Sequence, residues 1–469
     1  YVPIRLATNL EFDGNKKAIK NLSASGYKAG LFSHVTATLN VHDLTMQNVT
    51  LTSVIETGDG LPSAAAIVGS AYCAPTYPLT VSDVTVEGLT VNGKVEDGGK
   101  EYVGSKYVGG IVGYVSRIGE SAENIVTISN CTVKSTDMQG YTVGGILGQL
   151  GGGTATIVNP SVEGAIDGAA REGGIVGADS GATLYINDYD EANNNANISG
   201  QAAKNSGKIV GLVGNTYLNN VKMITATGQD ALNSAINDNT AVVAILGEGT
   251  YTLPSLDGKD VTIVGTKDTV VDMKDETNGH AKNIAFEGVT VEFSDADYKG
   301  FQHTEKLTYR DCIIKGFQCL YATDVEFIGC TFKQETKDRY SVQVYGSTNV
   351  TFTDCHFYGV DKNVYIYQET LDSDKNVTFN KCDFHMSNEN KTENKSAVML
   401  NSALNFGQYK YNVVINDCTA ENACNTAADN EAGKTNYQGL YGLKHKDGYG
   451  NALLVVGTVT VDGVKVYDN

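Results

Sequence analysis

Short segments of alternating apolar and polar residues recur along the chain in one common form. Two apolar residues alternate with variable ones, a turn residue follows, and the apolar alternation then restarts, most clearly between Val350 and Phe357. A period of two predicts β-strands. The turn position is mostly Asn, Asp or Gly, the residues that most readily adopt a left-handed backbone. We therefore predict a strand, a bend and a second strand in each copy.

Eleven copies of this template occur, and their turn positions are Asn48, Asp83, Asn130, Asn159, Gly288, Asp311, Gly329, Asp354, Lys381, Asp417 and Gly463. One template kept along the chain is typical of a solenoid, in which each repeat forms a coil and contacts only its neighbours. The predicted fold class is all-β, a right-handed parallel β-helix in two tandem segments.

A second motif lies between template copies in the N-terminal half, where glycines flank two or three apolar residues, as in Gly145-Ile146-Leu147-Gly148. Such a motif suits a short buried strand whose two ends approach neighbouring backbone closely. The six copies begin at Gly30, Ala66, Gly110, Gly145, Gly174 and Gly211. Together the two motifs resemble the GLUG repeats of bacterial surface adhesins, and we assign residues 1–220 to such a segment.

The pattern changes near residue 225. Residues 229–238 predict one amphipathic helix, and the apolar strand 242–246 follows it. This order resembles the start of pectate-lyase-like right-handed β-helices, in which a short helix caps the first coil. An open solenoid end exposes core and strand edges, so a cap is expected. We assign residues 221–469 to a pectate-lyase-like parallel β-helix.

Charge and hydropathy limit the partners. The net charge of −19 disfavours nucleic acid, whose phosphates would be repelled. No run of about 18 apolar residues predicts a membrane span. The chain opens at Tyr1 without a signal-like segment, and we expect a leader to precede it. The resemblance to adhesins implies an extracellular or cell-surface location, with outer-membrane anchoring of the full-length protein.

Six of the nine cysteines occupy the position just after the bend, where side chains should point inward: Cys131, Cys312, Cys330, Cys355, Cys382 and Cys418. We expect reduced cysteines that act as small apolar residues in an internal column. One or two disulfides, or a metal, remain the alternative, although parallel side chains rarely reach disulfide geometry.

The resemblance to pectate lyases also raises an enzymatic interpretation, because that superfamily contains lyases and glycoside hydrolases. The sequence has no adjacent Asp pair and no Gly-His-Gly motif, and we assign no catalytic residue and no metal. The best enzymatic candidates are His303, Arg310, Asp311 and Arg339, which lie on early coils of the second segment. Asp311, however, already has a structural role at a turn position. No cofactor is predicted, with calcium left open.

The ligand-binding candidates are Gln343, Tyr345, Tyr365 and Tyr367. If the alternating Val342, Val344, Val364 and Ile366 face inward, these four side chains share an outer face on neighbouring coils. Aromatic rings interleaved with amides suit sugar binding. The alternative is that the tyrosines only pack across strands. His356 and His385 are also expected to face outward, as unremarkable solvent-exposed histidines.

Three functions remain open. We favour a bacterial cell-surface or secreted protein that serves adhesion or carbohydrate binding without catalysis, with a polysaccharide or a host or cell-surface glycoprotein as partner. The alternative is a polysaccharide lyase or glycoside hydrolase of the parallel β-helix class. A further alternative is a structural stalk.

Overall fold

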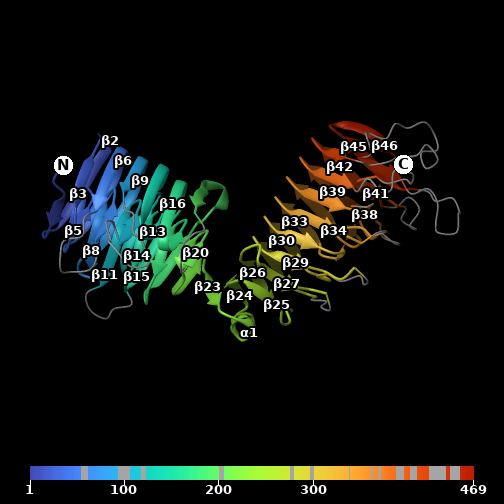
Figure 1. Ribbon diagram of the computed structural model, residues 1–469, viewed down its shortest axis with the longest axis horizontal. Coiled ribbons are helices and arrows are strands. Elements are labelled where there is room, and N and C mark those ends of the chain that lie inside the picture. The colour runs from blue at the N-terminus through green and yellow to red at the C-terminus, as the bar shows by residue number, and fades with distance from the viewer. Residues whose placement is uncertain are drawn as a thin grey trace. The chain divides into compact units, whose positions relative to one another are not determined.

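The computed structural model describes residues 1–53, 62–92, 106–117, 123–199, 205–274, 279–295, 300–336, 339–360, 363–367, 371–386, 396–401, 409–421, 440–443 and 455–468. The chain forms two compact units, Tyr1–Ile224 and Thr225–Asn469. Each unit is a stack of coils built from parallel strands (Figure 1). We predicted the division at 220/221; the identities assigned to the two segments stay predictions.

Unit 1 contains a sheet of seven short strands. Six of them hold residues of the Gly-flanked motif, β5 (Phe32–Val35), β8 (Val68–Cys73), β11 (Val112–Arg117), β14 (Leu147–Leu150), β17 (Val176–Asp179) and β21 (Val210–Leu212), whereas β1 (Ile4–Leu6) holds none. Of the longer strands, those that carry the turn template are β6 (Leu39–Ser53), β9 (Leu79–Asn92), β12 (Asn124–Ser129), β13 (Thr132–Gly144), β15 (Thr154–Val158) and β16 (Ser161–Gly173). The others are β2 (Leu10–Lys20), β18 (Thr183–Asn187) and β19 (Asn194–Ile198). Short segments complete the coils: β3 (Ser23–Gly26), β4 (Lys28–Ala29), β7 (Ser63–Ala65), β10 (Tyr107–Gly109), β20 (Asn205–Gly207), β22 (Asn215–Leu218), β23 (Val221–Ala226) and a 3₁₀ turn at Glu191–Asn193.

The flanking glycines allow close approach between coils. A Cβ on Gly145 would lie 2.1 Å from the carbonyl oxygen of Gly174, and one on Gly148 would lie 2.3 Å from that of Gly113. Because both contacts are to backbone, which cannot move aside, a side chain would break the stacking. The tight approach expected at both ends of this motif is confirmed for the copies that begin at Gly110, Gly145 and Gly174. The sixth copy lies three residues earlier than predicted, because Val210 pairs with Val176 and Gly211 takes the second glycine position.

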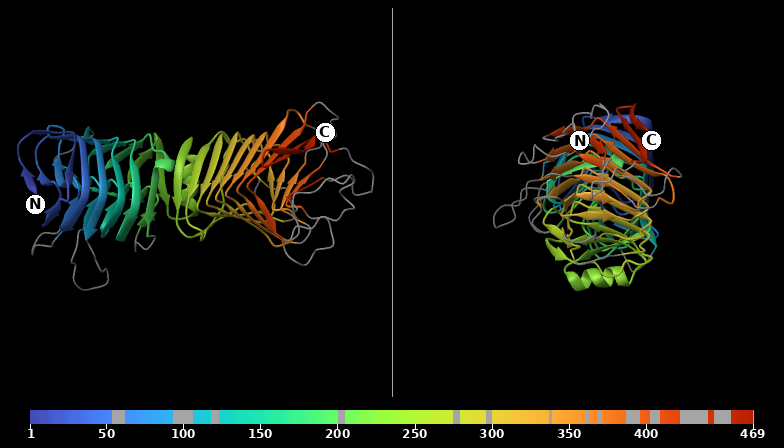
Figure 2. Two further views of the ribbon diagram at one scale, coloured as in Figure 1. Left: turned by 90° about the horizontal axis from the view of Figure 1, so that it is seen from above. Right: turned by 90° about the vertical axis from the view of Figure 1, so that its right-hand side faces the viewer.

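Unit 2 has three faces. Its first sheet contains β24 (Ala241–Leu246), β26 (Asp260–Val264), β28 (Asn283–Glu287), β30 (Lys306–Arg310), β33 (Asp324–Ile328), β36 (Asn349–Thr353), β39 (Lys375–Asn380), β42 (Tyr411–Asn416) and β45 (Gly457–Val461). The second sheet follows each bend: β25 (Gly249–Tyr251), β27 (Thr269–Asp272), β29 (Thr290–Glu292), β31 (Ile313–Lys315), β34 (Thr331–Gln334), β37 (His356–Gly359), β40 (Asp383–Met386) and β43 (Thr419–Glu421). The third sheet contains β32 (Gln318–Leu320), β35 (Val342–Val344), β38 (Val364–Ile366), β41 (Val398–Leu400) and β44 (Tyr441–Leu443). Figure 2 shows the stacked strands from the side.

The bend of the turn template is confirmed at every copy, but after the last bend the strand Val464–Asp468 returns antiparallel and Val464 is 54% exposed rather than inward. All eleven turn positions have a positive φ, from 49° at Asn159 to 78° at Gly463. Lys381 departs from the Asn, Asp or Gly rule and still has a φ of 53°. Its backbone N–H donates to the carbonyl of Asn416 on the next coil at 2.9 Å, so the stack imposes a conformation that lysine alone disfavours.

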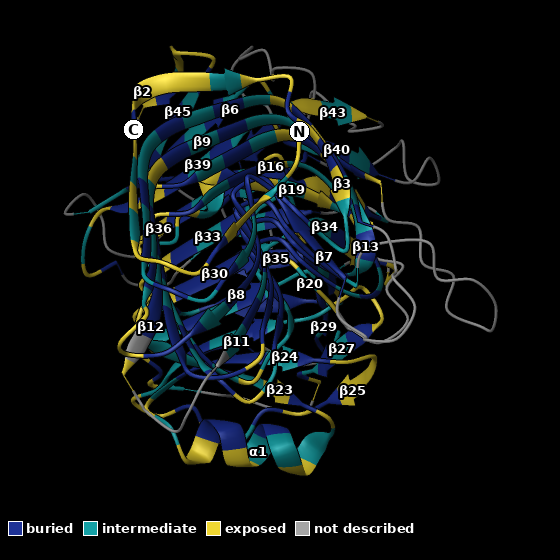
Figure 3. Cartoon of the chain, turned by 90° about the vertical axis from the view of Figure 1, so that its left-hand side faces the viewer, coloured by how far each residue is buried: buried dark blue, intermediate teal, exposed yellow. Residues whose placement is uncertain are grey.

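Identical positions on successive coils form internal columns. The rings of Phe327, Phe352 and Phe379 stack with centroids 4.8 Å apart, which is the spacing of neighbouring strands. The cysteine column is buried at Cys312, Cys330, Cys355 and Cys382 and half-buried at Cys418, and all five are free thiols. Most strands are largely buried, whereas β2, β25 and β43 are largely exposed (Figure 3).

Three of the stack ends carry a helix or an antiparallel strand in place of a further parallel coil. Helix α1 (Gln229–Asn237) precedes β24 and buries Leu232, Ala235 and Ile236, while its other face is exposed (Figure 3). At the far end of unit 2, β45 pairs antiparallel with β46 (Val464–Asp468), and in unit 1 β22 pairs antiparallel with β23. The predicted fold class, a parallel β-helix in two tandem segments with a capping helix, is confirmed. No helix among the described residues is long and apolar enough to span a bilayer.

Candidate functional site

The third sheet of unit 2 places the predicted ligand-binding residues on adjacent coils. Strands β35 and β38 pair in parallel, with Gln343 opposite Tyr365 and Val344 opposite Ile366. The alternating Val342, Val344, Val364 and Ile366 are buried, as the sequence predicts. Tyr345 and Tyr367 follow their strands directly and are half-buried, as is Tyr365.

Five half-buried tyrosines form one contiguous group, which we call the tyrosine cluster: Tyr321, Tyr340, Tyr345, Tyr365 and Tyr367. Tyr365 stacks on Tyr340 at 4.6 Å and on Tyr367 at 5.7 Å between ring centroids. Tyr345 contacts Tyr367 edge-on at 6.3 Å and Tyr321 at 5.4 Å. Tyr321 and Tyr340 were not predicted, because neither lies in an alternating segment.

The ring geometry determines what this cluster can offer a ligand. Stacked rings cover one another's faces, so Tyr365 presents its edge rather than a free face. Tyrosine combines an apolar ring with a hydroxyl, which suits the mixed apolar and hydroxylated surface of a sugar. The cluster therefore resembles a row of phenol edges more than the flat platform that alternation alone suggests.

Gln343 does not share the exposure that we predicted. Its register beside Tyr365 is as expected, but the residue is only 5% exposed. Outward orientation was inferred from alternation alone, which does not determine how far an outward side chain is exposed; Gln343 lies between its register partners Cys319 and Tyr365. Gln343 lies beneath the surface. Its burial does not support the role that we predicted for it, a polar contact to the ligand.

A buried phenol lies close to the cluster. Burial, and then the neighbouring Tyr345, Tyr367 and Tyr365, raise the pKa of Tyr411. Its hydroxyl is buried without a hydrogen-bond partner among the described residues. A buried polar atom without a partner costs about 1–3 kcal/mol and calls for an explanation such as a ligand or water.

Lys375 adds a positive charge next to this phenol. It pairs in register with Tyr411, and its side chain is 3% exposed. Its ammonium lies 2.6 Å from the Asp372 carboxylate, whose side chain is 78% exposed, and this contact lowers the pKa of Asp372. The buried ammonium of Lys375 is thus neutralised by the exposed carboxylate of Asp372.

A second arrangement lies on the outer face of the second sheet. The Asp383 carboxylate contacts His356 Nδ1 with one oxygen and lies 2.6 Å from His385 Nε2 with the other, and Glu421 lies 2.8 Å from His385 Nδ1. We call these four residues the histidine–carboxylate chain. Burial lowers the pKa of His385, but the hydrogen bonds that its imidazole donates to Glu421 and Asp383 outweigh this effect, and the net shift of the pKa is upward. The outward orientation of both histidines is confirmed, but they are not solitary.

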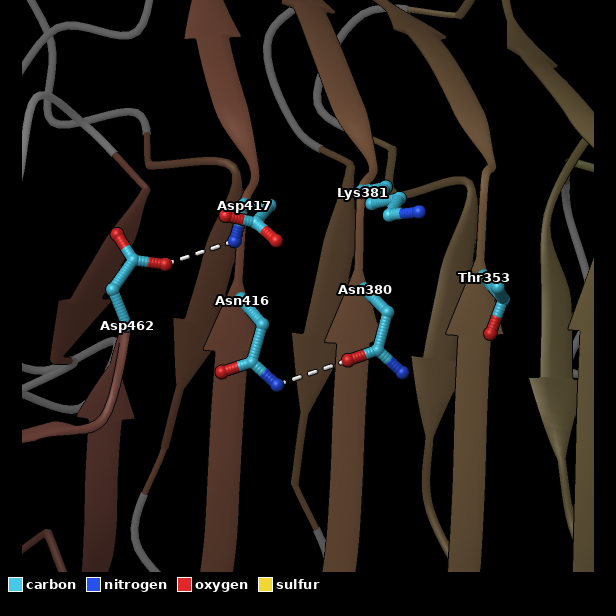
Figure 4. A pocket seen from close by; sticks show the side chains of 6 residues that line it. All are labelled: Thr353, Asn380, Lys381, Asn416, Asp417 and Asp462. Carbon is cyan, nitrogen blue, oxygen red and sulfur yellow. Dashed lines mark hydrogen bonds between the residues drawn. The ribbon is translucent and has the colours of Figure 1, made fainter.

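An open groove of about 660 Å³ runs along the bend between the first and second sheets. It is lined by Thr353, Asn380, Lys381, Asn416, Asp417 and Asp462 (Figure 4). Asn416 Nδ2 donates to Asn380 Oδ1 at 2.9 Å, and the Asp417 N–H donates to Asp462 at 2.8 Å. Lys381 lies two residues before Asp383, so the groove and the histidine–carboxylate chain share one turn.

The enzymatic candidates from the sequence are not brought together. His303 precedes β30, whereas Arg310 and Asp311 lie at its far end, separated by five strand residues or about 16 Å. His303 stacks on His280 with centroids 5.0 Å apart, and Arg310 Nη2 lies 4.0 Å from Glu326. Asp311 has a φ of 52°, which confirms its turn role.

One group with the spacing of metal ligands occurs among the described residues, Asp13, His42 and Asp43 in unit 1. Asp13 is exposed, and hydrogen bonding to Asp43 raises the pKa of His42. This surface ion pair needs no metal to explain it.

Comparisons with known proteins identify no family for this chain. No family model matches the chain, and no curated protein matches it. Among solved structures, it is similar to the PL6 family alginate lyase AlyGC, with 9% identity over 95% of this chain and 96% of that one and a TM-score of 0.26. It is also similar to an arginine-to-alanine mutant of the same lyase, with 9% identity over 96% of this chain and 97% of that one and a TM-score of 0.28. Neither score supports an argument about activity.

Proposed function

We propose that this protein is a carbohydrate-binding parallel β-helix whose binding face is the tyrosine cluster of unit 2. The observation that carries the proposal is the contiguity of five half-buried tyrosines over neighbouring coils. An extended glycan can lie along such a row, because successive coils repeat every 4.8 Å or so. Binding would be weak at each contact and strengthened by repetition along the polymer.

The buried groups beside the cluster favour a polar ligand. Tyr411, whose hydroxyl has no partner among the described residues, and Lys375 are register partners on adjacent coils. A sugar hydroxyl or an ordered water that it holds would satisfy the phenol. An apolar partner would leave it unsatisfied.

The biological setting follows from the sequence resemblance and is part of the same proposal. We propose a secreted or cell-surface bacterial protein that uses this face for adhesion to a polysaccharide or to a host or cell-surface glycoprotein. Because the net charge is −19, most of the surface should repel acidic glycans. Neutral glycans, or glycans whose charge is screened locally, are therefore favoured there.

A glycan-binding screen tests the proposal. The protein is run through gels that contain neutral or acidic polysaccharides, once with calcium and once with chelator. We expect retarded migration in at least one polysaccharide. Migration unchanged in every gel, with the protein folded by circular dichroism, would contradict the proposal, and loss of retardation in chelator would identify a calcium requirement.

A polysaccharide lyase is the second candidate, favoured by the histidine–carboxylate chain. Asp383 contacts Nδ1 of His356, which can orient that imidazole so that its Nε2 serves as a general base. Lyases leave unsaturated sugar ends that absorb ultraviolet light. Absorbance that grows with the parent protein and not with a His356→Ala variant would establish this activity, whereas absence of growth on every retained polysaccharide would exclude it for those substrates.

A further inference from the structure

A pocket in unit 1 gathers three basic side chains from three strands. Arg5 on β1 pairs in register with His34 on β5, and Lys28 lies on β4. Together with Tyr27 and Tyr72 they line a hollow of about 410 Å³. That volume is in the range of small-molecule sites, and larger than a bare ion requires.

The basic groups lie unusually close together. Lys28 Nζ is 3.0 Å from His34 Nδ1, so the lysine donates to a neutral imidazole. Burial, then Lys28, then Arg5, lower the pKa of His34 to about 4, and burial and Arg5 lower the pKa of Lys28. No ion pair joins Arg5, Lys28 or His34 to a carboxylate among the described residues, although the whole chain carries a net charge of −19.

Aromatic rings hold the lysine in place. Its Nζ lies 5.5 Å from the ring centroid of Tyr72 and 5.9 Å from that of Tyr27. Tyr72 also contacts His34 edge-on at 4.9 Å and 88°. Cation–π contacts orient the ammonium without neutralising it, so the pocket keeps its positive field and gains an apolar wall.

We propose that this pocket binds the carboxylate of an acidic saccharide. Arg5 and Lys28 supply the charge, His34 and Lys28 form the polar floor, and the Tyr72 ring borders the sugar. An anion placed among like charges relieves their repulsion, and a guanidinium suits a carboxylate through paired hydrogen bonds. The site lies in a different unit from the tyrosine cluster, so the two can be tested separately.

The test follows the imidazole resonances of His34 by NMR during titration with glucuronate, with glucose and inorganic phosphate as parallel titrants. Glucuronate should shift these resonances and raise the pKa of His34, because a bound anion offsets its cationic neighbours. Glucose should leave both unchanged, and phosphate should bind more weakly than glucuronate. Arg5→Met and Lys28→Met should each weaken glucuronate binding about tenfold.

Lys222→Met is the matched control, because Lys222 also lies over a tyrosine ring in unit 1, 4.8 Å from that of Tyr217. It should bind glucuronate like the parent. No shift with glucuronate, an equal shift with glucose, or tighter binding of phosphate would each overturn the proposal. The parent titration decides the matter even if Arg5→Met fails to fold.

Discussion

Gln343 and Tyr365 are register partners on adjacent coils of the third sheet, yet Gln343 is 5% exposed whereas Tyr365 is half-buried. The same face of one sheet therefore holds a covered amide and an accessible phenol. If the proposed glycan-binding face is correct, Tyr365 is therefore accessible to a ligand and Gln343 is not.

Gln343→Ala should lower stability without removing glycan binding. Loss of a buried side chain of this size costs on the order of 1 kcal/mol or more. Thermal unfolding should shift down, and retardation in a glycan gel should stay within about twofold of the parent. Loss of binding at unchanged thermal stability would instead indicate that Gln343 contacts the glycan directly, as the sequence predicted.

Tyr411→Phe should be neutral or stabilising by up to about 1 kcal/mol, because it removes a buried hydroxyl that has no partner among the described residues. Tyr309→Phe is the matched control. The hydroxyl of buried Tyr309 accepts a hydrogen bond from Gln318 Nε2 at 2.6 Å, so its removal should destabilise by about 1 kcal/mol. Denaturant unfolding of both variants measures the contrast, and equal effects would contradict it.

The buried cysteines should be free thiols that react only after unfolding. Burial raises the pKa of Cys131 and of Cys319 to about 12, and thiolates, not thiols, react. In folded protein at neutral pH these buried cysteines should not react with a thiol reagent, whereas the half-buried Cys418 is more accessible. Denatured, unreduced protein should react fully. Cys355→Ala should cost on the order of 1 kcal/mol through the cavity it leaves. Missing thiols in the denatured sample would indicate disulfides.

The raised pKa of His385 gives unit 2 a small pH dependence. A histidine whose folded pKa is raised adds stability below its unfolded pKa of about 6.5, and this stability is lost as pH rises through the folded value. Glu421→Gln should therefore lower thermal stability at about pH 5.5 and not at about pH 9, by less than about 1 kcal/mol because the pair is partly exposed. Glu326→Gln is the control. It removes a carboxylate whose partner is an arginine rather than a histidine, so its effect on thermal stability should show no such pH dependence.

Local chemistry explains which features could be predicted. The bends at Asp354 and Asp417 follow from residue preference, and inward positions such as Val350 and Phe352 follow from alternation. The contact between His356 and Asp383 depends on how two coils 27 residues apart align, because loop lengths vary between copies. The burial of Gln343 depends on side chains outside the template, which alternation does not describe.

The most direct test removes Tyr345 and Tyr367 together. The account predicts that the Tyr345→Ala and Tyr367→Ala double variant loses retardation in any glycan gel that retards the parent, with thermal unfolding nearly unchanged. The control removes two exposed tyrosines elsewhere, Tyr77 and Tyr358, which are 44% and 47% exposed, and should migrate like the parent. A double variant at Tyr345 and Tyr367 that binds as well as the parent would contradict the account.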